Sequence, residues 1–235
     1  MHPKPKKWRL KMKKKVEKNF IVTGLLFLLF VLFTIVVSTV DVRPIGPEGS
    51  KVGLATINDG VLQVLGVHLI WYTITDWLGI VAILTAFGFA LVGLIQLVKR
   101  KSLLCVDASI IILGVYYVIV IAAYVFFEMF VINYRPIILE ESVGLEPSFP
   151  SSHTMLVLCI MGTAMVQFHW LIQNKVRRMI LDILSGIVIV VTVGGRLISG
   201  VHWFTDIVGG MLLGAAFIML YYSVVFGVKY RKEEK

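Results

Sequence analysis

Charged residues are scarce in this sequence. Asp, Glu, Lys and Arg together make up only 16% of its 235 residues, where about 25% is usual in a soluble domain. Apolar types reach 58%. This balance argues against a soluble globular enzyme, a disordered chain and a nucleic-acid-binding module, and it indicates an integral membrane protein.

Cysteine is nearly absent as well. Cys105 and Cys159 both lie in apolar runs, without a CxxC or Cys/His spacing. This pattern supports neither a disulfide framework nor a zinc site. We expect both thiols to be buried in the core.

Long apolar runs are what the sequence does have. A bilayer core of about 30 Å needs roughly 20 apolar residues per helix, and six runs meet this length. They cover residues 20–40, 77–98, 103–127 (with Asp107 near its start), 154–172, 179–199 and 207–228. The predicted fold class is therefore all-α, a polytopic membrane protein with six transmembrane helices. Residues 20–228 form the membrane domain, between a basic tail over residues 1–19 and a second tail over residues 229–235.

Positive charge is distributed unevenly between the two ends of these spans. The two tails and the turns at residues 99–101 and 175–178 fall on one side and hold 19 of the 23 Lys and Arg residues. Under the positive-inside rule, this side and both termini are cytoplasmic. The net charge of +9 is then a topology signal, with a possible contact to anionic lipid, rather than a nucleic-acid arm.

The longest outer connection covers residues 41–75. Its apolar residues recur near helical spacing over residues 57–71 and end in Trp71 and Tyr72, which predicts an outer interfacial helix. A short re-entrant segment is the alternative. His68 and Asp76, beside this segment, are expected to face water, or else a lipid headgroup.

Polar residues gather at the outer ends of the predicted spans. They form three short clusters: Tyr134-Arg135-Pro136, Pro150-Ser151-Ser152-His153, and Gly195-Arg196 followed by His202 and Asp206. Each cluster alone could be an interface anchor, a helix cap or a packed histidine. Because ionisable groups at membrane depth are costly and tend to be functional, their placement on one face indicates a site.

The residue types in these clusters predict chemistry on an anion. His202 and Asp206 are four apart, so on a helix they share a face, and the carboxylate would fix the tautomer of the imidazole. Arg135 and Arg196 offer forked donors that match phosphate oxygens. His153 begins a helix, where free backbone amides attract anions. No third metal ligand accompanies them at a suitable spacing, so we expect neither a metal nor another cofactor.

In these motifs the chain resembles the type 2 phosphatidic acid phosphatase superfamily, the membrane-bound lipid phosphatases that include undecaprenyl pyrophosphate phosphatases. The family pattern is K-x6-R-P, then P-S-G-H, then S-R-x5-H-x3-D. This sequence has E-x6-R-P at residues 128–136, P-S-S-H at 150–153 and G-R-x5-H-x3-D at 195–206. The resemblance covers about residues 77–228.

The resemblance implies a role for each matched position. His202 would attack phosphorus and form a phosphohistidine, and Asp206 would orient it. His153 would protonate the leaving oxygen and then help to activate water. The residues implied to hold the phosphoryl oxygens are Arg135, Arg196, Ser151 and Ser152, the last through its amide.

Two positions depart from the family pattern. Gly195 stands where the family has Ser, and Glu128 stands where it has a phosphate-binding Lys. A carboxylate 4 Å from a phosphate would repel it by about 4 kcal/mol at an effective dielectric of 20. Glu128 could pair with Arg135 along a continuous helix, or meet a positive group or a divalent ion. A cation of the first outer loop, Arg43 or Lys51, could replace the Lys, catalysis could be weakened, or Glu128 could have no role.

The expected function is hydrolysis of a lipid phosphate or pyrophosphate at the outer face of a bacterial plasma membrane. Undecaprenyl pyrophosphate is the first candidate substrate, followed by phosphatidylglycerol phosphate and phosphatidic acid. The alternatives are a lipid phosphotransferase and a catalytically weakened member that binds or transports a lipid phosphate. Gly210-x3-Gly214 in the last span also allows a homodimer.

Overall fold

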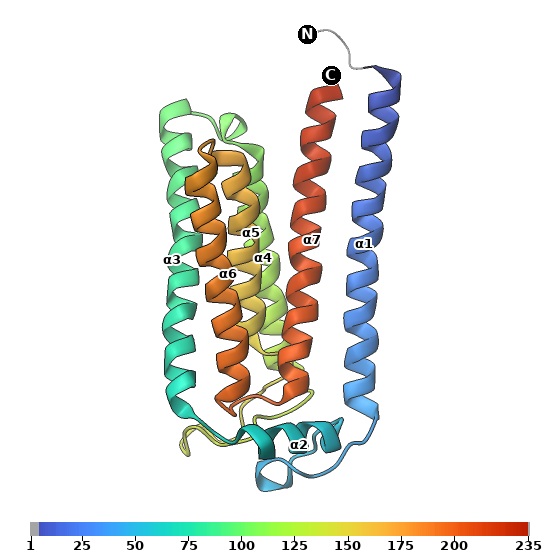
Figure 1. Ribbon diagram of the computed structural model, residues 1–235, viewed down its shortest axis with the longest axis vertical. Helices are drawn as coiled ribbons and strands as arrows, with labels where there is room; N and C mark the ends of the chain where they lie inside the picture. The colour runs from blue at the N-terminus through green and yellow to red at the C-terminus, as the bar shows by residue number, and fades with distance from the viewer. Residues whose placement is uncertain (1–4, 235) are drawn as a thin grey trace.

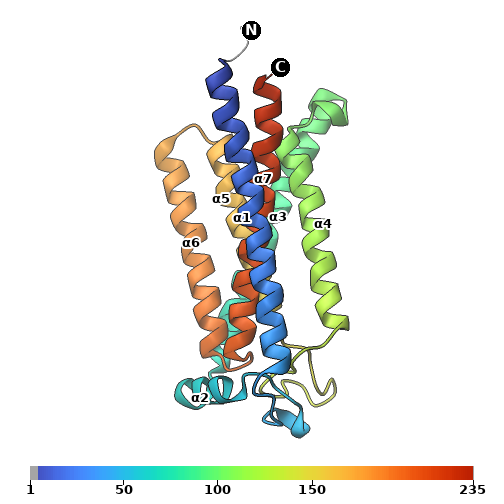
Figure 2. The same ribbon diagram turned by 90° about the vertical axis from the view of Figure 1, so that its right-hand side faces the viewer.

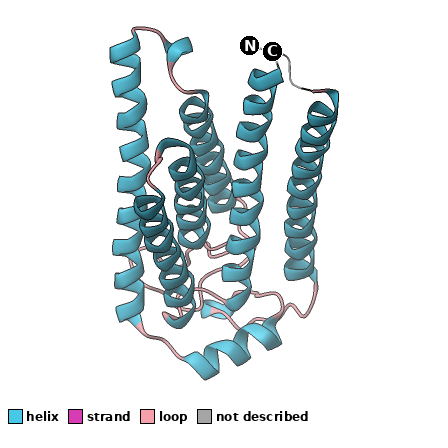
Figure 3. Ribbon diagram, turned by 45° about the horizontal axis from the view of Figure 1, so that its top comes forward, coloured by secondary structure: helices cyan, strands magenta, loops and turns pink. Residues whose placement is uncertain are grey.

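The computed structural model describes residues 5–234, and these are almost entirely helical. Six helices are long and apolar enough to cross a membrane, so the predicted all-α, six-span architecture is confirmed (Figures 1 and 3). The helices are α1 (Lys6–Thr39), α2 (Ala55–Leu65), α3 (Leu69–Arg100), α4 (Ala108–Met129), α5 (Ser152–Leu171), α6 (Lys175–Ile198) and α7 (Phe204–Glu234), with 3-10 turns at Pro47–Gly49 and Leu103–Cys105.

The first and last spans continue into the basic ends of the chain. α1 begins already at Lys6, so the segment expected as a separate tail over residues 1–19 is helical from that residue. α1 packs along α7, and the rings of Trp8 and Tyr230 lie 5.9 Å apart. Residues 1–4 and 235 of the expected tails lie outside the described residues. Both termini are at the same end of the bundle (Figure 1).

The third span begins later than the sequence indicates. α4 starts at Ala108, so Asp107 precedes the helix instead of interrupting it. Its carboxylate accepts hydrogen bonds from Arg100 at 2.8 Å and from Gln96 at 2.9 Å. Cys105 lies in the turn before it and is exposed, which corrects the expectation of two buried thiols; Cys159 is buried.

α5 is the central helix of the bundle. It contacts α3, α4, α6 and α7, and Figure 2 shows it between the outer helices α6 and α4. More of its apolar window is buried within the protein than in any other candidate span, and that window is the least apolar of the six. A helix surrounded by protein needs no lipid-facing surface, whereas α1, α3, α4 and α6 present many large apolar side chains outward.

Glycines on α7 allow it to approach α5 closely. A Cβ at Gly210 would lie 2.8 Å from the carbonyl oxygen of Ser151, and one at Gly214 would lie 2.9 Å from Leu158 Cβ. The Gly210-x3-Gly214 face is therefore occupied within the chain. This face is therefore not available for the homodimer that the sequence allowed.

The outer helix α2 lies across the end of the bundle opposite the termini (Figures 1 and 2). It is shorter than the predicted residues 57–71, because it ends at Leu65 and α3 begins at Leu69. One side of α2 is exposed and the other is buried: Val64 is 84% exposed, whereas Asn58 is buried. Asn58 donates to Thr205 Oγ1 at 2.9 Å and accepts from the Thr205 amide at 3.1 Å. These bonds fix α2 to the first turn of α7, beside the predicted site residues.

Candidate active site

Two segments that are distant in the sequence meet at the end of the bundle opposite the termini. One is the loop between α4 and α5 with the first turn of α5, and the other runs from the last turn of α6 to the first turn of α7 (Figure 1). These segments carry the predicted site residues Arg135, Ser151, Ser152, His153, Arg196, His202 and Asp206. Backbone bonds join the segments, since the Ser151 amide donates to the carbonyl oxygen of Asp206 at 2.9 Å.

His202 and Asp206 face each other, although they do not share a helix. α7 begins at Phe204, so His202 lies in the connection before it, and the expected common helix is wrong. His202 Nδ1 nevertheless lies 3.6 Å from Asp206 Oδ2. The carboxylate also accepts hydrogen bonds from the Trp203 amide at 2.9 Å and from Asn133 Nδ2 at 3.4 Å. The first turn of α7 thus holds the carboxylate against Nδ1 and leaves Nε2 of His202 for a reaction.

The surroundings of His202 favour its neutral form. Burial of the ring, and then the positive charges of Arg135 and Arg196, lower the pKa of His202 well below its ordinary value. A neutral imidazole has a free lone pair, which a nucleophile requires. His202 is therefore ready to attack an electrophile at neutral pH.

The two arginines are held from different sides. The Arg135 amide donates to the carbonyl oxygen of Glu146 at 3.0 Å, and its Nε lies 3.3 Å from Glu146 Oε2. Arg196 is fully buried at the end of α6, with its guanidinium 4.7 Å from the centre of the Tyr72 ring. These contacts hold both side chains near His202, and they leave some N–H groups of each guanidinium without a hydrogen-bond partner.

Nitrogen atoms without a hydrogen-bond partner collect in this site. Among the described residues, buried side-chain nitrogens of Arg135, His153, Arg196 and His202 have none. Buried polar groups in proteins almost always have a partner, and forked guanidinium donors match the oxygens of a phosphate. This arrangement fits an oxyanion held between the two arginines and the two histidines.

The P-S-S-H segment forms the first turn of α5. Ser151 is the N-cap: its hydroxyl accepts a bond from the Thr154 amide at 3.5 Å. That bond uses the oxygen as acceptor and leaves the hydroxyl hydrogen available to a phosphate. The amides of Ser152 and His153 open the helix, where no helix carbonyl can reach them, so this turn can also receive negative charge.

Asp76 is a site residue that the sequence analysis missed. It was expected to face water or a lipid headgroup, whereas its Oδ1 lies 3.1 Å from His153 Nε2 and contacts Arg196 Nη2 as well. The available signal was an acidic residue close to the start of a transmembrane helix, a position that is often functional.

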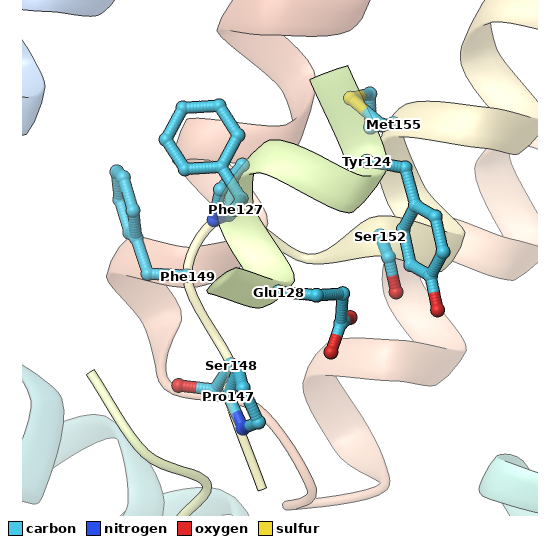
Figure 4. Close-up of a pocket in the computed structure, with 9 residues that line it drawn as sticks. Tyr124, Phe127, Glu128, Pro147, Ser148, Phe149, Ser152 and Met155 are labelled. Carbon is cyan, nitrogen blue, oxygen red and sulfur yellow. The ribbon is translucent and has the colours of Figure 1, made fainter. Parts of the chain in front are cut away.

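Glu128 does not form the ion pair with Arg135 that was one of the alternatives for this residue. α4 ends at Met129, so no continuous helix joins the two residues, and Arg135 pairs with Glu146 instead. Glu128 lines a small pocket with Tyr124, Ser148 and Ser152, next to the start of α5 (Figure 4). Its carboxylate therefore faces the first turn of α5 from the α4 side.

Neither cation of the first outer loop replaces the family Lys. Arg43 is engaged by Asp41 at 3.0 Å and by Thr56 at 2.5 Å, and Lys51 is exposed. Within residues 5–234, the structure contains no group of three His, Cys, Asp or Glu side chains placed to hold a metal ion.

A solved structure of similar fold is the crystal structure of a transmembrane PAP2-type phosphatidylglycerolphosphate phosphatase from Bacillus subtilis. The match has a TM-score of 0.61 and 16% identity, and covers 86% of this chain and 94% of that chain. No curated protein matches the sequence significantly. The family model of the PAP2 superfamily matches residues 109–230, just over half of the chain, which include Arg135, His153, Arg196, His202 and Asp206. The chain therefore belongs to the PAP2 superfamily, the type 2 phosphatidic acid phosphatases.

Proposed function

We propose that this protein is a lipid phosphate phosphatase that acts through a phosphohistidine. The observation that carries the proposal is the group of buried, unpartnered nitrogens on Arg135, His153, Arg196 and His202. The group lies beside a His202–Asp206 pair. Positioning and electrostatic stabilisation of this kind account for most of the catalysis of phosphoryl transfer.

The reaction has two halves. His202 Nε2 attacks the terminal phosphorus while the bond from that phosphorus to the leaving oxygen breaks, and His153 gives this oxygen a proton. The leaving oxygen belongs to the lipid alcohol of a monoester or to the lipid phosphate of a pyrophosphate. Water then attacks the phosphohistidine, the P–N bond breaks, and His153 takes the proton of the water. Asp206 stabilises the positive charge that develops on His202, while Arg135 and Arg196 hold the phosphoryl oxygens.

The substrate that we propose first is undecaprenyl pyrophosphate, followed by phosphatidylglycerol phosphate and phosphatidic acid. Phosphatidylglycerol phosphate also has the support of the structural relative's name. The test is phosphate release by purified protein in detergent from each lipid, with and without EDTA. Release that is unaffected by EDTA and specific to one lipid supports the metal-free reaction and identifies the substrate; no release from any of them contradicts the proposal.

We further propose that the protein lies in a bacterial plasma membrane, with both termini in the cytoplasm and the site on the extracytoplasmic side. The site lies at the end of the bundle opposite both termini (Figure 1), and the basic turns at residues 99–101 and 175–178 lie at the end of the termini. Reporter domains fused to either end should be active only in the cytoplasm. An extracytoplasmic reporter at the C-terminus would overturn this orientation.

A second candidate function, binding or transport of a lipid phosphate without turnover, is favoured by Glu128. Its carboxylate faces the start of α5, where the family has a cation. We expect Glu128→Lys to raise kcat/KM for a phosphate monoester by about tenfold, because it replaces repulsion of the substrate by attraction.

The matched control for this variant is Glu140→Lys, which makes the same charge change at an exposed position of the loop between α4 and α5. It should leave kcat/KM unchanged. A large loss in Glu128→Lys alone would show that Glu128 has its own role in turnover. A wild-type chain that binds a lipid phosphate without releasing phosphate would favour the second function.

A further inference from the structure

One face of α3 forms a wall of the site. Tyr72, Asp76 and Gly79 follow at spacings of four and three residues, so they lie on the same side of the helix. Tyr72 and Asp76 both contact the guanidinium of Arg196. A Cβ at Gly79 would lie 3.4 Å from His153 Cδ2. The His153 ring therefore lies against α3 at Gly79, where even a Cβ would only touch it, and its Nε2 lies beside the Asp76 carboxylate.

The close approach of α3 depends on a glycine in α6. A Cβ at Gly195 would lie 2.6 Å from Thr75 Cγ2 and 3.1 Å from Trp71 Cε3. Gly195 is the position where the family pattern has Ser, and a serine side chain would push the two helices apart. This departure from the pattern and the position of Asp76 are thus linked: the glycine allows α3 to bring the carboxylate to Arg196 and His153.

The contact with Asp76 decides which nitrogen of His153 is available. Nε2 lies 3.1 Å from the carboxylate, whereas Nδ1 is buried and has no hydrogen-bond partner among the described residues. The other charged or titratable groups around this ring are basic: Arg135, Arg196 and His202. A proton donor has to carry a proton, and an adjacent carboxylate stabilises the protonated imidazole.

We propose that Asp76 is a positioning residue for His153, and that the site contains two Asp–His pairs with different tasks. Asp206 serves the nucleophile His202, and Asp76 orients and stabilises the proton donor. This inference rests on the proposed phosphatase function. As the P–O bond to the lipid breaks and the bond from His202 Nε2 to phosphorus forms, the proton moves from His153 Nδ1 to the leaving oxygen.

The experiment compares two leaving groups. A short-chain phosphatidic acid releases an alkoxide that needs a proton, whereas p-nitrophenyl phosphate releases a stable phenolate that does not. The quantity compared is kcat/KM, which reports the steps up to departure of the leaving group and leaves out the later attack of water on the phosphohistidine. For Asp76→Asn, kcat/KM on the lipid should fall on the order of 100-fold, and kcat/KM on the aryl phosphate should fall less than about threefold. His153→Gln should show the same selectivity. Asp76→Glu, which retains the charge, should recover part of the lipid activity.

Asp59→Asn is the matched control, since it makes the same substitution in α2 at the same end of the bundle and should change neither rate. Equal losses on both substrates, or a rise in KM with kcat unchanged, would assign Asp76 to holding Arg196 and overturn the proposal. A gain of activity would also overturn it, because it would show the carboxylate to be a stand-in for the phosphate. If the wild-type chain hydrolyses neither substrate and also releases no phosphate from undecaprenyl pyrophosphate or phosphatidylglycerol phosphate, the proposed function fails, and this role fails with it.

Discussion

Turnover disappears when His202 is replaced by asparagine. We expect kcat to fall on the order of 10⁴-fold or more, as for the loss of other enzymic nucleophiles. Asparagine is close in size to the imidazole but cannot form the covalent intermediate. The rate is measured as phosphate release, and the intermediate is sought by rapid acid-free quenching with ³²P-labelled lipid, since phosphohistidine is labile to acid and stable to base.

The control for this variant is His68→Asn, which removes an exposed histidine at the same end of the bundle. It should retain wild-type turnover and the labelled intermediate. More than a tenth of the wild-type rate in His202→Asn would contradict the phosphohistidine mechanism, provided that the variant melts near the wild-type temperature. Label that persists in this variant would indicate another nucleophile.

The spans could be predicted because the bilayer imposes a length and an apolar character on each of them. The ends of the helices could be predicted less well. α1 continues back to Lys6, since its basic part packs along the end of α7, as the contact of Trp8 with Tyr230 shows. This contact joins residues more than 200 positions apart, and a local sequence pattern cannot predict it.

The composition of the site was accessible from the motifs, but its geometry was not. The x3 spacing of His202 and Asp206 suggests a common helix, yet the chain turns at residues 199–203 and the helix begins after His202. The two side chains still meet because the Trp203 amide binds the carboxylate and holds it at the start of α7. Local spacing allows several backbones, and the tertiary contacts select one of them.

The partners of the two arginines were the least predictable part of the site. Arg135 pairs with Glu146 because the chain between them folds back, with a bridge between Tyr134 and Pro147. Arg196 pairs with Asp76, which lies 120 residues earlier in the sequence. Both pairs depend on loop closure and helix packing, whereas the sequence pattern reports only neighbours on one element.

Replacing Arg196 by lysine should have the second-largest effect on activity. The guanidinium performs several tasks at once: it lies over the Tyr72 ring, contacts Asp76, and keeps Nε and Nη1 free of protein partners. A lysine ammonium is a single point of charge and cannot bind Asp76 while presenting a fork to the phosphate. We expect kcat/KM to fall by about 10² to 10³, the usual cost of removing one donor to a developing oxyanion.

Arg177→Lys is the matched control, because it makes the same substitution at an exposed position in the first turn of the same helix. It should leave kcat/KM within about twofold of wild type, as expected for a surface residue. If the two variants behaved alike, the positive charge of Arg196 would suffice and the forked geometry would be unnecessary. A loss confined to Arg196→Lys, in protein of unchanged melting temperature, would show that the site requires the planar guanidinium. The contacts from α3 would then serve to hold that plane toward the phosphoryl group.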